Sequence, residues 1–100
     1  MNAGAAPEIL VHHNTAASRF EAYVDGSQLG ILTYELRRTR IELVHTVTAP
    51  DHRGRGIASA LVRAALEDVR RSGAEALIIC PFVESWLQRH PEYGDLVIVD

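Results

Sequence analysis

The feature that most constrains this chain is a glycine-rich stretch, Asp51 to Ala58, with the sequence DHRGRGIA. A β-branched run from Ile41 to Thr48 precedes it, and an amphipathic run from Ile57 to Arg71 follows it. This order predicts a strand, a tight turn and a helix. The first N–H groups of a helix have no partner within the helix, and the helix dipole adds partial positive charge there. Because glycines let a ligand approach the backbone and two arginines add full charge, the stretch predicts a phosphate or pyrophosphate site.

The composition indicates one small domain. One hundred residues, 47% of them hydrophobic, can form a single core, so we expect a flexible lead-in over Met1 to Glu8 and one compact domain over residues 9–100. All ten basic residues are arginines, but the formal net charge of −3 argues against general nucleic-acid binding. The single cysteine, Cys80, excludes an internal disulfide. No run reaches membrane-spanning length, and we expect a cytoplasmic protein without a membrane partner or a metal.

Alternation of apolar and polar residues predicts an antiparallel meander before the loop. Short turns such as Asp25-Gly26 connect the β-prone segments. The predicted strands are Ile9–His12, Arg19–Val24, Leu29–Leu36 and Ile41–Thr48. If the last of these strands is regularly pleated, it places four side chains on one face: Ile41, Leu43, His45 and Val47.

The pattern changes after the loop. A helix is predicted over Ile57 to Arg71, and a strand over Ala76 to Cys80 is expected to lie parallel to the strand before that helix. Pro81 is suited to begin a second helix, which Pro91 ends. Leu96 to Val99 is a candidate final edge strand. The predicted fold class is therefore α/β (α+β): a mostly antiparallel mixed sheet with one parallel βαβ pair and two helices.

Two common phosphate-binding motifs do not fit this chain. A P-loop needs a lysine, and the sequence has none. A dinucleotide-binding fold needs a third glycine and an acidic residue after the next strand, where this chain has Cys80-Pro81. A phosphate- or nucleotide-binding protein of another type stays open as a weaker hypothesis.

The residues of the loop, Arg53-Gly54-Arg55-Gly56-Ile57-Ala58, resemble the R/Q-x-x-G-x-G/A motif of the GNAT (Gcn5-related) N-acetyltransferases. Further motifs, in order, resemble one compact subfamily, the YjdJ-type N-acetyltransferase-like domain. They are Val44-His45-Thr46, Cys80-Pro81-Phe82-Val83 and Arg89-His90-Pro91-Glu92-Tyr93. The resemblance extends from about Ile9 to Val97. Unlike larger acetyltransferases, this chain lacks helices between its first two strands, which in those enzymes build much of the acceptor site.

The resemblance implies a GNAT-like fold and an acetyl-CoA-dependent N-acetyltransferase. The pyrophosphate would lie on the backbone N–H groups of the loop, with Arg55 as a charge contact. The pantetheine arm would lie between the strands Ile41–Thr48 and Ala76–Cys80. The implied cofactor-binding residues are Thr46, Val47, Thr48, Arg53, Gly54, Arg55, Gly56, Ile57, Ala58 and Cys80.

Two residues are candidates for catalysis. His45 is suited to accept the proton of an attacking amine, because histidine changes charge near neutral pH; the alternative is a hydrogen-bonded histidine in the sheet. Cys80 is a candidate for an acyl-enzyme intermediate, or lines the pocket, as buried cysteines more often do. Direct transfer in a ternary complex is favoured over ping-pong transfer through Cys80. Tyr93 is a candidate acid for the leaving thiolate, or a packed aromatic residue. We expect Trp86 to anchor the core and His90 to cap or pack against the last helix, with a functional role for His90 as the less favoured alternative.

The acceptor is predicted to be a primary amine of a small molecule or a protein. A second hypothesis, from another class, is a non-catalytic acyl-CoA-binding sensor or interaction module. The sequence is compatible with a monomer or a homodimer, since the predicted edge strand Leu96–Val99 could pair with a second copy.

Overall fold

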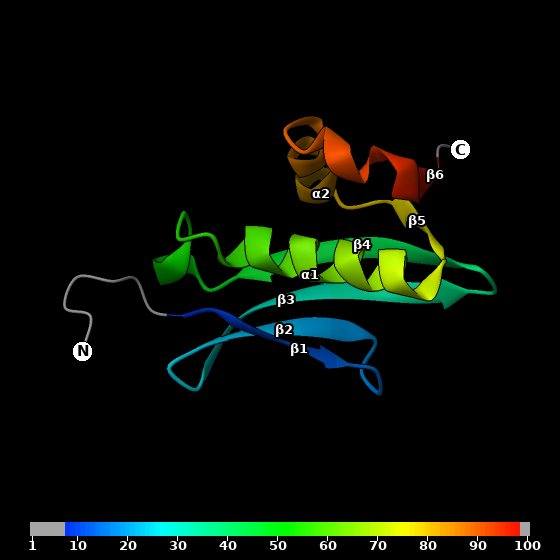
Figure 1. Ribbon diagram of the computed structural model, residues 1–100. Coiled ribbons are helices and arrows are strands. Elements are labelled where there is room, and N and C mark those ends of the chain that lie inside the picture. The colour runs from blue at the N-terminus through cyan, green and yellow to red at the C-terminus, as the bar shows by residue number, and fades with distance from the viewer. Residues whose placement is uncertain (1–7, 99–100) are drawn as a thin grey trace.

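The computed structural model describes residues 8–98 of the chain. A six-stranded sheet, in the order β1-β2-β3-β4-β5-β6, combines with two α-helices and two short 3-10 helices (Figure 1). The elements are β1 (Leu10–Asn14), β2 (Arg19–Val24), β3 (Ser27–Arg37), β4 (Arg40–Thr48), η1 (Pro50–His52), α1 (Ile57–Ser72), β5 (Glu75–Ile78), α2 (Pro81–Gln88), η2 (Pro91–Leu96) and β6 (Val97–Ile98). The expected lead-in, apart from Glu8, and the predicted strand residue Val99 lie outside the described residues.

The predicted fold class is confirmed. Strands β1 to β4 form the expected antiparallel meander, and β5 lies parallel to β4 after the crossover through α1. The sheet also contains a second parallel pair, between β5 and β6, beyond the single pair predicted. Strand β6 begins at Val97 rather than Leu96, because the turn that starts at Pro91 continues as the 3-10 helix η2 up to Leu96.

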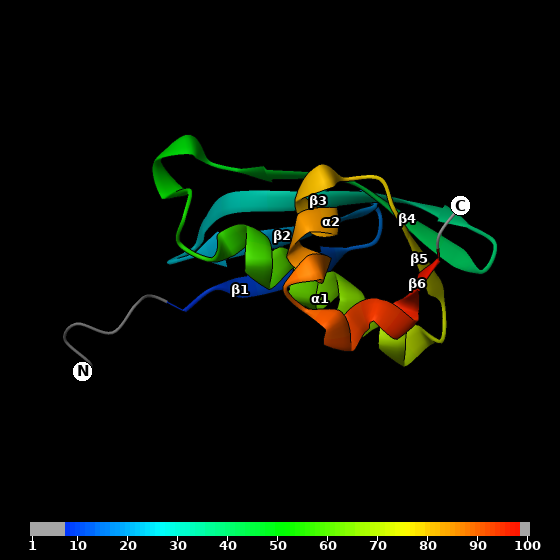
Figure 2. The same cartoon turned by 90° about the horizontal axis from the view of Figure 1, so that it is seen from above.

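Helix α1 covers one face of β1 to β4 (Figures 1 and 2). It begins at Ile57, directly after Gly56, and ends at Ser72; the cap residue Gly73 follows, and its N–H donates to the carbonyl of Val69. Its amphipathic pattern is that of a surface helix. The buried residues of α1 are Ile57, Leu61, Val62, Ala65, Leu66 and Val69. No helix in the described part of the chain is long and apolar enough to cross a membrane.

The core lies between α1 and the sheet. The sheet contributes buried hydrophobic side chains from four strands: Phe20, Ala22, Leu32, Tyr34, Ile41, Leu43 and Ala76. Strand β3 and helix α1 approach closely at Gly30, where an added Cβ would lie 2.8 Å from Cγ2 of Ile57. Helix α2 and η2 pack beside α1 through Trp86 and Tyr93, which are both buried, so the expectation for Trp86 is confirmed.

The opposite face of β1 to β4, which we call the open face, carries no helix of residues 8–98 (Figure 2). Strand alternation and register assign to it, among others, these side chains of β2 to β4: Arg19, Glu21, Tyr23, Ile31, Thr33, Glu35, Glu42, His45 and Val47. Glu21 is only 3% exposed, and its carboxylate accepts hydrogen bonds from Asn14, Arg19 and Tyr23. This face is therefore polar and hydrogen-bonded at its centre.

Candidate functional site

A β-bulge in β4 divides the strand into two parts. Thr33 of β3 pairs with His45, but Tyr34 pairs with Leu43, so Val44 is an extra residue with no partner in β3. A bulge resets the alternation of side chains along the strand. A regular pleat would place His45 and Val47 on the same face as Ile41 and Leu43. The bulge instead places them on the opposite face.

Strands β4 and β5 separate at the same level. Their pairing ends at Leu43 and Ile78, and the N–H groups of Ile79 and Cys80 both donate to the carbonyl of Leu43, at 2.9 and 3.0 Å. Beyond this point β4 continues to Thr48, and within residues 8–98 it has a neighbouring strand only on its β3 side. The edge of β4 that faces α2 is therefore open to pairing with an extended ligand.

A groove of about 380 Å³ runs from this edge to the start of α1. Its walls come from β4, from the loop before α1, from the first turn of α1 and from the start of α2. The lining residues are Thr46, Thr48, His52, Arg53, Gly54, Gly56, Ile57, Ala58, Ser59 and Phe82. The groove thus joins the separated part of β4 to the glycine-rich loop, two features that the sequence places next to each other.

The two loop glycines adopt backbone conformations that disfavour other residues. Gly54 has a φ of 80° and Gly56, the N-cap of α1, has a φ of 83°, both in the left-handed region. A Cβ at either position would meet no protein atom within 4 Å. The glycines therefore leave free space beside the N–H groups at the start of α1, as an anion site requires.

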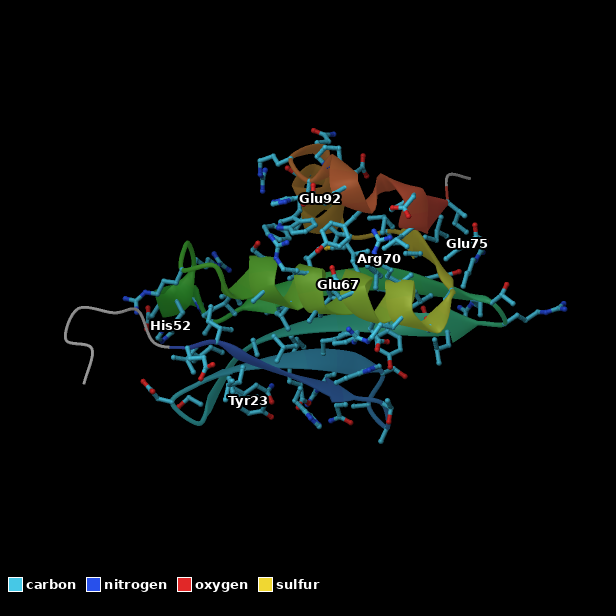
Figure 3. The ribbon with its side chains drawn as sticks, in the orientation of Figure 1. Tyr23, His52, Glu67, Arg70, Glu75 and Glu92 are labelled. Carbon is cyan, nitrogen blue, oxygen red and sulfur yellow. The ribbon has the colours of Figure 1, made fainter. Side chains whose placement is uncertain are left out.

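The two loop arginines lie on different sides of the start of α1. Arg53 lines the groove, whereas Arg55 lines a separate cavity of about 580 Å³ together with residues such as Val24 and Leu29. His52 contributes to both hollows and lies at the loop end of the molecule (Figure 3). By its position, Arg53 is better placed than Arg55 to neutralise a phosphate in the groove.

Cys80 lies behind the groove, at the start of α2. The side chain is 4% exposed, and its sulfur lies 3.3 Å from the hydroxyl oxygen of Thr46. Burial raises the pKa of the thiol, whereas the hydrogen bond with Thr46 lowers it. Nearby backbone N–H groups, those of Val83, Phe82 and Thr46, lower the pKa further, so that it lies below the ordinary value for cysteine.

His45 lies on the open face, away from Cys80 and Thr46. Its side chain is exposed, it lies opposite Thr33, and it donates no hydrogen bond to another described residue. Val47 follows the same alternation and is 55% exposed. The structure therefore brings Thr46, Thr48, Cys80 and the loop together on the side of α1, and it places the side chains of His45 and Val47 on the other side.

Tyr93 is held in a packed cluster on α1. Its hydroxyl donates to Glu67 at 2.7 Å, and this bond is the main cause of a raised tyrosine pKa. His90 stacks on Trp86 with ring centroids 3.8 Å apart, as expected for a packing residue. Figure 3 shows Glu67 and Arg70 on the side of α1 that faces η2. The contacts of Tyr93 correspond to the packed aromatic residue that was one of its two predicted roles.

Sequence reasoning did not assign Ser59 or Phe82 to the site. Both line the groove, and the Ser59 hydroxyl accepts a hydrogen bond of 2.7 Å from the indole N–H of Trp86. Ser59 lies in the first turn of α1, and Phe82 follows Cys80-Pro81 at the start of α2. A search for residues at the two helix starts would have found them. Among residues 8–98, no group of three or more His, Cys, Asp or Glu side chains is arranged to hold a metal ion.

Comparisons with known proteins agree with this architecture. Residues 19–96 match the sequence model of the GCN5-related N-acetyl-transferase family. The chain is 32% identical over 85 residues to Protein NATD1 of Mus musculus, covering 83% of this chain and 77% of that protein. It is 33% identical to Protein NATD1 of Bos taurus, covering 83% and 75% of the two chains.

Two solved structures share the fold. A GCN5-like protein from Staphylococcus aureus, solved by NMR, superposes with a TM-score of 0.70 at 20% identity, covering 89% of this chain and 87% of that one. Ribosomal-protein-alanine N-acetyltransferase from Brucella melitensis biovar Abortus superposes with a TM-score of 0.58 at 22% identity, covering 82% and 62%. With the family match over most of its length, the chain belongs to the GCN5-related N-acetyltransferase family.

Proposed function

We propose that this protein is an acetyl-CoA-dependent N-acetyltransferase that transfers an acetyl group to a primary amine. The observation that carries the proposal is the groove that joins the open edge of β4 to the start of α1. A long ligand with a peptide-like arm and a pyrophosphate needs an open strand edge for the arm and a helix start for the pyrophosphate, joined by one continuous groove. Membership of the acetyltransferase family supports the same ligand. The order of the loop, Cys-Pro-Phe-Val and His-Pro-Glu-Tyr motifs supports a compact, YjdJ-type enzyme.

The groove offers each part of acetyl-CoA a suitable partner. The N–H groups at the start of α1 and the Arg53 guanidinium would hold the pyrophosphate. The backbone of Thr46 to Thr48 would pair with the amide groups of the pantetheine arm, as an added strand does. Phe82, which is 38% exposed, would cover the apolar part of that arm.

The chemistry is acyl transfer from a thioester. A neutral amine attacks the carbonyl carbon, an oxyanion forms, and the thiolate of CoA leaves. We propose His45 as the base that receives the proton of the amine. Cys80 has a lowered thiol pKa, which favours a nucleophile, but its side chain is 4% exposed and lies behind Thr46. Direct transfer is therefore the favoured route, and Cys80 lies behind Thr46, which lines the groove.

The test separates binding from turnover. Isothermal titration of the full chain with CoA should show saturable binding, and a native mass spectrum should detect any CoA that purifies with the protein. Acetyl-CoA with an amine panel that includes peptides should release free CoA above the hydrolysis seen without amine. Absence of CoA binding would refute the proposal. Competition by simple nucleotides as effective as CoA would instead support a general nucleotide-binding protein.

A second candidate function is a non-catalytic acyl-CoA-binding module. It is favoured because no described residue makes a hydrogen bond with the His45 side chain that would orient it as a base. In that case CoA would bind tightly, but no amine, including peptide amines, would raise CoA release above background.

A further inference from the structure

The structure points to the kind of acceptor, and this inference rests on the proposed function. We propose that the acceptor amine is a lysine side chain of a polypeptide that lies across the open face, next to His45. The thioester and the amine would then reach the reaction centre from opposite sides of the sheet. Three sets of observations lead to this proposal: the direction of side chains at the bulge, the shape of the open face and its charge.

The bulge at Val44 separates the two candidate catalytic side chains. After the bulge, Thr46 lies on the side of α1 and contacts Cys80, whereas His45, the preceding residue, lies on the open face. Strands β4 and β5 have already separated at this level. A ligand in the groove and a group beside His45 would therefore meet through the gap between these two strands.

The open face beside His45 is broad and exposed. His45 is exposed, Val47 is 55% exposed, and Thr33 and Ile31 are half-buried. A hollow lined by residues that include Ile31 and Val47 has a volume of about 230 Å³. Sites for small molecules usually bury most of the ligand. A polypeptide, in contrast, supplies its own surface to exclude water, so this face suits a macromolecular acceptor.

The charge of this face also argues against small polycationic amines. The Glu21, Glu35 and Glu42 carboxylates each form an ion pair with an arginine. Besides these three glutamates, the open face and the tip of the β3–β4 hairpin carry four arginines: Arg19, Arg37, Arg38 and Arg40. A polyamine or amino sugar would find no excess negative charge here. A lysine with acidic residues further along the chain fits better.

The transfer step balances with the groups present. The neutral lysine nitrogen bonds to the acetyl carbonyl carbon, and the carbon–sulfur bond of the thioester breaks. The proton lost by the nitrogen passes to the His45 imidazole. CoA leaves as a thiolate, which takes up a proton from water. The products are an acetylated lysine and free CoA.

The first experiment compares acceptors with the full-length protein and acetyl-CoA. The peptide carries an acetylated N-terminus, one internal lysine, and two glutamates four to six residues away. Spermidine, glucosamine and free lysine represent small amines. A lysine-free peptide with a free N-terminus tests whether the α-amine is the acceptor. The lysine peptide should give a kcat/KM at least tenfold above every other acceptor, with the acetyl group placed on the lysine by mass spectrometry.

The second experiment blocks the open face. Thr33→Trp places a large side chain opposite His45, and tryptophan is favourable in strands. It should lower kcat/KM for the peptide at least tenfold while the affinity for CoA stays unchanged. Leu36→Trp adds the same ring at a position 68% exposed near the end of the hairpin, and it should change neither quantity.

The outcomes separate this inference from the proposed function. CoA binding with peptide turnover that Thr33→Trp lowers supports both. CoA binding with faster turnover of a small amine or of the α-amine overturns the lysine acceptor and leaves the acetyltransferase intact. Equal loss of CoA affinity and turnover in Thr33→Trp overturns the opposite-face approach. Failure to bind CoA overturns the proposed function itself, and this inference with it.

Discussion

The hydroxyl oxygen of Thr46 lies 3.3 Å from the sulfur of Cys80, although 34 residues separate them along the chain. The contact joins the open part of β4 to the start of α2, at the inner end of the groove. It also links the electrostatics of the thiol to a residue whose backbone is proposed to bind acetyl-CoA. This contact can be tested without knowledge of the acceptor.

Thr46→Val should raise the pKa of the Cys80 thiol. The hydroxyl stabilises the thiolate by hydrogen bonding, and valine keeps the shape but removes that bond. The pH at which alkylation by iodoacetamide reaches half its maximal rate should therefore move upward. Thr48→Val, which removes a hydroxyl from the same groove, is the control and should leave the midpoint in place.

Cys80→Ala should retain acetyl transfer, because direct transfer does not pass through the thiol. Incubation of the native protein with acetyl-CoA alone should leave Cys80 unmodified in an intact mass spectrum. Initial rates at several concentrations of both substrates should give intersecting lines. An acetyl group on Cys80, with parallel lines and loss of activity in Cys80→Ala, would establish the ping-pong route instead.

Gly56→Trp should abolish tight CoA binding and leave a folded domain. Gly56 lines the groove, and no protein atom lies within 4 Å of an added Cβ, so the new side chain would fill the groove rather than the core. Left-handed backbone costs other residues about 1–2 kcal/mol. Gly26→Trp, at a φ of 81° with equally open surroundings, controls for that strain. We expect Gly56→Trp, but not Gly26→Trp, to lose affinity for CoA at least about tenfold, or about 1.4 kcal/mol. Equal CoA affinities of the two variants would refute the pyrophosphate site.

His45→Ala should lower kcat by about 100-fold, a usual contribution of a general base, with little change in CoA affinity. The side chain lies on the open face, away from the groove, so binding should not depend on it. His12→Ala removes an exposed histidine of β1 and should have no effect on turnover. Equal losses of turnover and CoA affinity in His45→Ala would indicate a structural histidine.

Glu21 should make stability sensitive to acid. Hydrogen bonds from Asn14 and Arg19 lower the pKa of its carboxyl from 4.5 to about 2. Because the folded-state pKa lies below the unfolded one, the stabilisation is present above pH 4.5 and is lost as the pH falls towards 2. Urea denaturation across this range should show that the native protein has a larger free energy of unfolding than Glu21→Gln, and that this difference disappears in acid. Glu84→Gln, at an exposed position, is the control, and its difference in unfolding free energy from the native protein should change little with pH.

The order of strands, the glycine-rich turn and the crossover helix were predictable because each depends on local patterns. Alternation, turn residues and helical period are properties of neighbouring residues in the chain. The buried face of α1 agrees closely with its periodicity. The same local patterns predicted an anion site at the glycine-rich loop, whereas the assignment of Thr46 to Thr48 to the pantetheine arm came from the family resemblance.

The sequence by itself determined the elements, the loop and the family resemblance; only the tertiary structure decided which side each candidate residue faces. The bulge at Val44 depends on the pairing of β4 with β3, and that pairing moves His45 to the open face. The contact of Thr46 with Cys80 depends on the place where β5 separates from β4. Strand register and strand separation come from contacts between distant segments, so no local pattern could specify them.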